Sequence, residues 1–152
     1  MTFEPDPVMV RIGEGIALGQ QGDAPAARAL FATVWEQLPA SGDALHRCAL
    51  AHSMADVQDD PADELLWDLR ALAAADELTD ERVADATAAT SVAAFLPSLH
   101  LNLADVYLRL DQPDASARHV ASAEAALDAL PDDGYREMIG GGLARVRNQL
   151  AR

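Results

Sequence analysis

Residues 22–39 read GDAPAARALFATVWEQLP and predict the second half of a helical hairpin. Gly22-Asp23 ends a helix predicted over Val8–Gln21, and Pro25 falls in the first turn of the next helix, where its missing N–H costs no hydrogen bond. The apolar residues that follow keep the spacing of one helix face: Ala27, Leu30, Phe31, Val34 and Leu38. Pro39 and Gly42 end this second helix.

The same kind of punctuation divides the rest of the chain. Helices are predicted over about 43–57, after Pro61, from about Pro97, over about 115–130 and over about 135–150. In the helix after Pro61 the buried stripe is predicted at Leu65, Leu66, Leu69, Leu72 and Ala73. Residues 77–94 predict an insertion, a short helix capped by Thr79 or Asp80 being favoured over an ordered loop. Good helix formers dominate and no sustained apolar–polar alternation occurs, so the expected fold class is all-α.

The turns recur along the chain. Gly22-Asp23, Asp59-Asp60 and Asp111-Gln112 are separated by 37 and 52 residues, and the second spacing exceeds 34 by 18, about the length of the insertion. Within the hairpins, small residues stand at fixed places: Gly15 and then Ala27-x-x-x-Phe31 in the first, and Ala104-x-x-Tyr107 with Ser116-x-x-x-Val120 in the third. The second hairpin offers Cys48-Ala49 and Leu65-x-x-x-Leu69.

This period and these residues resemble the tetratricopeptide repeat (TPR) family. The first hairpin departs from the family pattern, because Arg11 and Glu14 fill the Trp and Leu positions, and His100 stands at the Trp position of the third. The resemblance implies a short right-handed solenoid with hairpins over about 8–39, 42–76 and 95–131, closed by a capping helix over 134–150. An irregular helical bundle is the alternative.

Composition limits the function classes. The chain has 152 residues with 25 acidic and 11 basic side chains, giving a formal net charge of −14. Such a charge repels nucleic acid phosphates and favours neutral or basic partners. The chain carries a single cysteine, the N-terminal residues do not suggest a secretion signal, and no apolar run has the length of a membrane span. We therefore expect a cytoplasmic protein; a homo-oligomer is compatible with these features.

Residue patterns typical of catalysis are lacking. His46 and His52 are six residues apart, not the four that would place two metal ligands on one helix face, and Cys48 lies on an apolar stripe, which predicts an inert thiol. Gly140-Gly141-Gly142 falls inside a predicted helix with no strand before it, so close helix packing is favoured over a phosphate loop. We expect no enzyme activity, no metal and no cofactor.

The family resemblance implies a protein- or peptide-binding adaptor whose groove is lined by the first helix of each hairpin. The groove positions are Met9, Ile12, Ile16, His46, Arg47, Leu50, Met54, Asn102, Asp105 and Arg109. The family's carboxylate clamp is not expected, because Asp105 would oppose an anion and the chain has no lysine. An apolar anchor with some polar or basic groups is the predicted partner segment. The alternative is a small-molecule-binding or substrate-acting helical protein with the insertion over a pocket.

Overall fold

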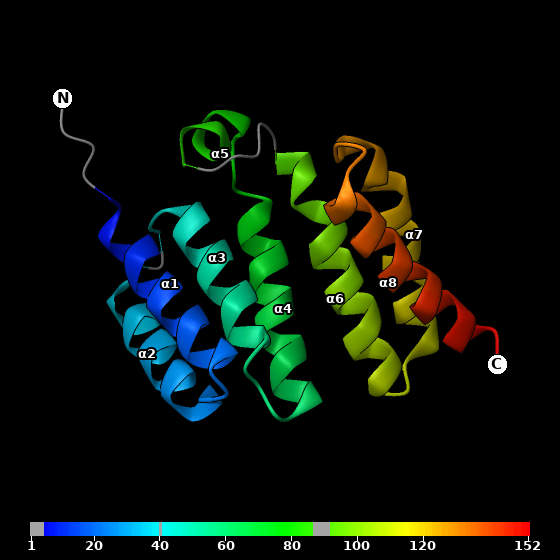
Figure 1. Cartoon of the computed structure of the whole chain (residues 1–152), viewed down its shortest axis with the longest axis horizontal. Coiled ribbons are helices and arrows are strands. Elements are labelled where there is room, and N and C mark those ends of the chain that lie inside the picture. Colours follow the sequence, from blue (N-terminus) through cyan, green and yellow to red (C-terminus); the bar gives the residue numbers. More distant parts are fainter. Residues whose placement is uncertain (1–4, 40, 87–91) are drawn as a thin grey trace. The chain divides into compact units, whose positions relative to one another are not determined.

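The computed structural model describes residues 5–39, 41–86 and 92–152. These residues form helices and no strand, so the predicted all-α class is confirmed for the described part of the chain. The elements are α1 (Pro7–Gln20), α2 (Ala24–Gln37), α3 (Ala44–Ala55), α4 (Pro61–Ala75), α5 (Asp80–Ala86), η1 (Val92–Ala94), α6 (Leu96–Arg109), α7 (Pro113–Ala126), η2 (Leu127–Ala129) and α8 (Gly134–Leu150) (Figure 1).

Side-chain caps explain where several helices begin. Asp6 Oδ1 accepts hydrogen bonds from the N–H groups of Val8 (3.0 Å) and Met9 (3.3 Å), and Asp43 Oδ1 accepts from Leu45 N (3.0 Å). Thr79 Oγ1 accepts from Arg82 N (3.2 Å), which confirms the predicted short helix within the insertion. Residues 87–91 of that insertion lie outside the described residues. Each cap satisfies an N–H that the first turn of a helix leaves without a backbone partner.

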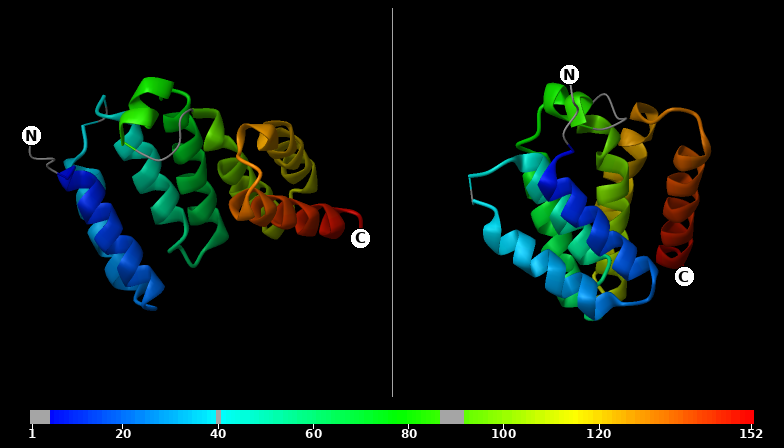
Figure 2. Two further views of the ribbon diagram at one scale, coloured as in Figure 1. Left: turned by 45° about the horizontal axis from the view of Figure 1, so that its top comes forward. Right: turned by 60° about the vertical axis from the view of Figure 1, so that its left-hand side comes forward.

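The chain divides into two compact units, residues 1–74 (unit 1) and 75–152 (unit 2). In unit 1, α1 and α2 form a hairpin, and α3 packs against both of them (Figures 1 and 2). In unit 2, α6 and α7 form a hairpin, and α8 packs against both. Each unit therefore contains a helical hairpin with the next long helix laid on it.

The unit 1 core depends on a very close approach of α1 and α2. Phe31 is fully buried, and a Cβ added at Gly15 would lie 2.2 Å from its Cε1 atom. The ring therefore occupies the space that any side chain at Gly15 would need. Its neighbours in this core cluster are Ile12, Ala27, Val34, Leu50 and Met54. The small and aromatic residues of the first hairpin's sequence pattern, Gly15 and Phe31, are thus packed directly against each other.

The hairpin of unit 2 repeats that of unit 1 after 89 residues. Adding 89 to the bounds of α1 (7–20) and α2 (24–37) gives the bounds of α6 (96–109) and α7 (113–126). The same shift carries Gly15 and Phe31 onto Ala104 and Val120, which are 0% and 1% exposed. In unit 2 the small residue is larger, with Ala104 in place of Gly15, and the large residue is smaller, with Val120 in place of Phe31. The summed side-chain volume at this contact is therefore partly conserved.

The turns of the two hairpins also match bond for bond. Gly22 has φ 86° and Asp111 has φ 58°, both in the left-handed region. In the first turn, Asp23 N donates to Leu18 O (2.9 Å) and Gly22 N to Gly19 O (3.1 Å). In the second, Gln112 N donates to Tyr107 O (2.9 Å) and Asp111 N to Leu108 O (3.1 Å). Both are Schellman motifs, which satisfy the last carbonyls of the first helix.

The last helix buries one face on the preceding hairpin, as expected for a capping helix. Ile139, Leu143 and Val146 of α8 join Val120 and Ala123 of α7 in the unit 2 core. Gly142 is part of the contact, because a Cβ there would lie 2.8 Å from Leu101 Cδ2. Gly140, in contrast, has no atom within 4 Å of the place where its Cβ would stand. The prediction of close packing at the glycine triplet is thus confirmed at Gly142 and wrong at Gly140.

This difference gives a matched test of the packing. We expect Gly140→Ala to stabilise the chain by about 0.5–1 kcal/mol, because alanine loses less backbone entropy than glycine in a helix interior. Gly142→Ala should not give that gain, because Leu101 must move to admit the methyl group. Urea unfolding of the two variants measures this. A larger gain from Gly142→Ala than from Gly140→Ala would contradict the α6–α8 contact.

The second hairpin differs from the sequence prediction. Five residues, 56–60, separate α3 from α4, whereas three separate the helices of the other two hairpins. In α4 the buried residues are Asp68, Ala71, Ala74 and Ala75, while Leu66 and Leu69 are 46% and 39% exposed and Ala73 is also exposed. The predicted leucine stripe is therefore wrong: α4 is rotated about its axis so that another face is buried. Small residues face the core here because they allow close helix approach.

Candidate functional site

Three of the predicted groove residues lie in the unit 1 core. Ile12, Leu50 and Met54 are 2%, 0% and 3% exposed and belong to one cluster with Phe31. Their assignment to a binding surface was wrong. Apolar side chains on neighbouring first helices gain more by packing on one another than by facing water, so these positions became helix–helix contacts. Met9 packs half-buried against the same cluster.

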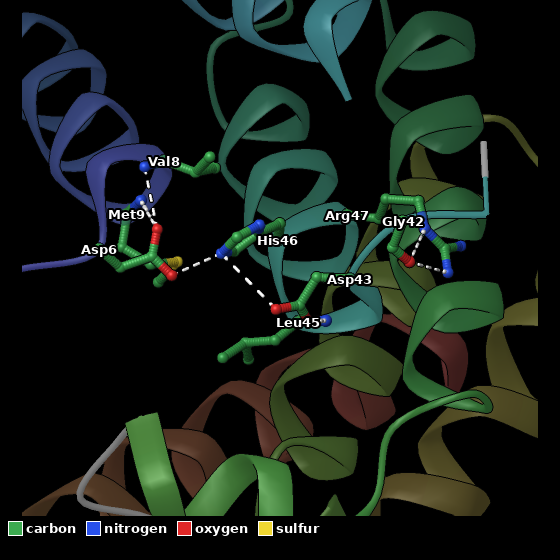
Figure 3. Close-up of polar contacts among 8 residues, drawn as sticks. All are labelled: Asp6, Val8, Met9, Gly42, Asp43, Leu45, His46 and Arg47. Carbon is green, nitrogen blue, oxygen red and sulfur yellow. Dashed lines mark hydrogen bonds and ion pairs between the residues drawn. The ribbon is translucent and has the colours of Figure 1, made fainter. Parts of the chain in front are cut away.

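His46 links the starts of two helices (Figure 3). Its Nε2 atom lies 2.6 Å from Asp6 Oδ2 and 3.7 Å from Asp43 Oδ2, and these two carboxylates are the N-caps of α1 and α3. Partial burial acts to raise the pKa of Asp6, but the hydrogen bonds from His46 and from the Met9 and Val8 N–H groups outweigh it, and the pKa is lowered. His46 thus has a structural role that its spacing in the sequence did not reveal.

Arg47 also makes a local contact. Its Nε and Nη2 atoms donate to the Gly42 carbonyl at 3.3 Å and 3.1 Å. Beside it, Trp35, Leu38 and Pro39 line a small cavity of about 150 Å³. The Trp35 ring packs edge-on against Trp67, with centroids 5.0 Å apart. Both tryptophans pack against the unit 1 core cluster.

The three groove residues predicted in the third hairpin lie together in unit 2. Arg109 Nη2 is 3.0 Å from Asp105 Oδ2, so these two side chains balance each other's charge. Asn102 and Asp105 also line a cavity of about 220 Å³ whose other wall is α8, with Arg145 and Gln149. This side of α6 therefore faces the capping helix in part.

A larger cavity, of about 300 Å³, lies where α1, α2 and the end of α3 meet; we call it the unit 1 cavity. Ile16 stands at its edge with 41% of its surface exposed. The other lining residues are Gly19, Gln20, Ala24, Phe31, Ser53, Asp56 and Val57. The wall is thus largely apolar, with one carboxyl, one hydroxyl and one amide group. Of the predicted groove residues, Ile16 is the one that reaches this cavity.

Asp56 is the charged group of the unit 1 cavity. Asp56 is exposed at the surface, but the protein atoms around its carboxyl partly desolvate it and raise its pKa, and the nearby His52 opposes the shift without cancelling it. Asp56 is also the C-cap of α3, where an acidic side chain meets the negative end of the helix dipole. Sequence analysis missed Asp56, although an acidic residue at an expected helix C-terminus was a usable signal.

Unit 2 contains a pair of histidines that the sequence analysis did not connect. His100 Nδ1 and His119 Nδ1 are 2.9 Å apart, with the ring planes inclined by 28°. Tyr107 stacks on His119 at a centroid distance of 5.5 Å. At this spacing one Nδ1 carries the shared proton and the other accepts it, so a second proton would bring two N–H groups face to face.

Desolvation by burial lowers the pKa of both histidines. Asp76 opposes the shift at His100, whereas His100 and Arg118 reinforce the shift at His119. A folded-state pKa below the unfolded value, about 6.5, means that the unfolded chain binds more protons as the pH falls through that range. The stability that the pair contributes is therefore present above about pH 6.5 and is lost towards the lower folded-state values.

We therefore expect the free energy of unfolding to fall as the pH is lowered from 7.5 to 5. In His119→Phe, which keeps a ring beside Tyr107 but removes the shared proton, this fall should be smaller. Urea titrations of both proteins across the range measure the slopes. Equal slopes would mean that the histidine pair does not control the acid response.

The described residues show few signs of catalytic chemistry. Cys48 is buried, and burial raises the pKa of its thiol to about 11, which fits the predicted inert cysteine. Within residues 5–39, 41–86 and 92–152, histidine, cysteine and acidic side chains do not gather in groups of three that could hold a metal ion. In the same part of the chain, each helix is too short or too polar to cross a lipid bilayer.

Comparison with family models, with curated proteins and with solved structures finds no match to this chain.

Proposed function

We propose that the chain is a short TPR-like array of helical hairpins that binds a segment of a protein or peptide and has no catalytic activity of its own. The right-handed stacking of the three hairpins is part of this proposal. The 89-residue repeat of helix bounds, turn bonds and small-to-large contacts supports it, since repeat proteins build each unit from the same supersecondary element.

The unit 1 cavity is the observation that carries the binding role. It combines an exposed apolar edge at Ile16 with polar groups at Ser53 and Asp56. Its volume of about 300 Å³ stands at the lower end of ligand pockets, which run from about 300 to 1,000 Å³. A site of this size suits one anchoring side chain of a longer segment better than a whole drug-sized molecule. The net charge of −14 favours a neutral or basic segment.

The remaining predicted groove residues lie in the two units. In unit 1 these are Met9, His46 and Arg47, which are half-buried, so part of each side chain stays accessible. In unit 2, Asn102, Asp105 and Arg109 form a polar patch of their own on α6. We assign the anchoring site of the partner segment to unit 1, because the unit 1 cavity and the exposed Ile16 lie there.

Selection of a random dodecapeptide library on the immobilised full chain tests the proposal. We expect selected peptides to bind in solution, and Ile16→Arg to weaken them by about tenfold or more by blocking the cavity. Val10→Arg is the matched control: Val10 lies on the same helix and is 45% exposed, close to the 41% of Ile16, but does not line the cavity. Calorimetric titration of both variants gives the comparison.

Two outcomes would contradict this function. One is a selection that yields no peptide binding in solution. The other is an equal loss of affinity in Ile16→Arg and Val10→Arg, which would place binding away from the cavity. A discrete small molecule retained by the purified chain would instead support the alternative of a small-molecule-binding protein.

A further inference from the structure

We propose that the unit 1 cavity accepts an arginine or lysine side chain of the bound segment, with Asp56 as the counter-ion of its cationic end. This inference rests on the proposed function and adds the chemistry of the anchoring residue. It is carried by the electrostatics at the end of α3, by the shape of the cavity wall and by the charge around it.

The C-terminal end of α3 has a negative electrostatic potential. The carbonyl groups of a helix C-terminus carry partial negative charge, and Asp56 adds a carboxylate at the C-cap. The chain already places one of its own cations nearby: Arg28 Nη1 donates to Val57 O at 2.6 Å and lies 3.5 Å from Asp59 Oδ2. A guanidinium is therefore accommodated beside Val57, a residue that also lines the cavity.

The wall leading to Asp56 is apolar. Ile16, Phe31 and Val57 line it, and Gly19 keeps it open, since a Cβ at Gly19 would already stand 3.2 Å from Val57 Cγ1. Arginine and lysine bury their aliphatic stems along apolar surface while the charged head meets polar groups. The cavity lining offers both parts: apolar groups at Ile16, Phe31 and Val57, and the carboxyl of Asp56.

Other anchoring side chains fit less well. A glutamate or aspartate would meet the carboxyl of Asp56 and the carbonyl groups at the end of α3. A purely apolar anchor would remove water from the exposed Asp56 carboxyl without adding a positive charge in its place, which is costly for a carboxylate. A cation relieves that cost.

Side-chain analogues of equal shape test the proposal in the full chain. The probes are N-acetyl-arginine methylamide and its uncharged isostere N-acetyl-citrulline methylamide, followed by amide chemical shifts at Gly19, Ser53, Asp56 and Val57. We expect saturable shifts with the arginine probe and about fivefold weaker binding of the citrulline probe, the upper range for a partly exposed ion pair. In Asp56→Asn the two probes should bind equally.

Asp63→Asn is the matched control, because Asp63 is an exposed acidic residue of α4 that does not line the cavity. It should leave the arginine preference unchanged. A preference that persists in Asp56→Asn, or equal binding of both probes to the wild-type chain, would overturn the proposal. Shifts spread over the acidic turns without saturation would do the same. Melting curves of each variant establish that it is folded.

The library selection separates this inference from the function on which it rests. Selected peptides that depend on Ile16 but contain no basic residue, and bind Asp56→Asn normally, would overturn the basic anchor and leave the peptide-binding role intact. Selected peptides whose single arginine cannot be replaced by citrulline without loss of affinity would support both. A failed selection would contradict the function, whatever the arginine probe does.

Discussion

Phe31→Ala should lower the free energy of unfolding by about 3–5 kcal/mol, the cost of removing a fully buried phenylalanine. The ring is 0% exposed and fills the space beside Gly15 in the unit 1 core. A loss of this size is a large share of the stability of a small domain. Chemical unfolding monitored by circular dichroism measures it. An unchanged midpoint would mean that the hairpin register in unit 1 is wrong.

Because Phe31 contacts Gly15, the effect of Gly15→Ala on the free energy of unfolding should change sign when Phe31 is removed. In the wild-type chain, Gly15→Ala should destabilise by about 1–3 kcal/mol, because the new Cβ would stand 2.2 Å from Phe31 Cε1 in a packed core. In the Phe31→Ala background the clash is gone, so the same substitution should stabilise by about 0.5–1 kcal/mol through helix propensity. A double-mutant cycle reads this coupling directly. Additive effects would contradict the contact.

A chain ending at Pro131 should aggregate. It lacks α8, whose Ile139, Leu143 and Val146 are 3%, 2% and 5% exposed in the intact chain. Each fully buried side chain of this kind is worth about 1.5–3 kcal/mol, and its removal also uncovers the apolar face of α6 and α7. Light scattering and dye binding report the exposed surface. A truncated chain that is monomeric and equally stable would contradict the capping role.

A milder variant keeps this test informative if the truncated chain does not fold at all. Leu143→Ala should cost about 2–5 kcal/mol. Met138→Ala on the same helix should cost almost nothing, because Met138 is 59% exposed. Equal losses of stability in both variants would mean that a different face of α8 packs against the hairpin.

Much of the fold could be predicted because turn residues mark the helix ends. Asp6, Asp23, Asp43 and Asp133 each accept hydrogen bonds from the first turn of a helix, and proline follows in several first turns. These effects are local, so the sequence is enough to place them. The rotation of α4 was not predictable in the same way. Leucines there spread over more than one face, and tertiary packing chose the face with Asp68 and Ala71.

The candidate site was less predictable than the fold. Repeat register placed Ile12, Leu50 and Met54 on the first helices, but register alone could not tell a groove residue from a contact between neighbouring first helices. Ile16 was found because its position follows from the same register, and it is exposed. Asp56 was missed because its environment arises from three helices that meet only in the folded chain.

The central claim is that a partner segment binds at the unit 1 cavity. Intermolecular nuclear Overhauser effects between a selected peptide and the methyl groups of the intact chain test it most directly. We predict contacts from one peptide side chain to the Ile16 and Val57 methyl groups, with none to Val10. Contacts confined to Val10, or to the exposed Leu66 and Leu69 of α4, would contradict the claim.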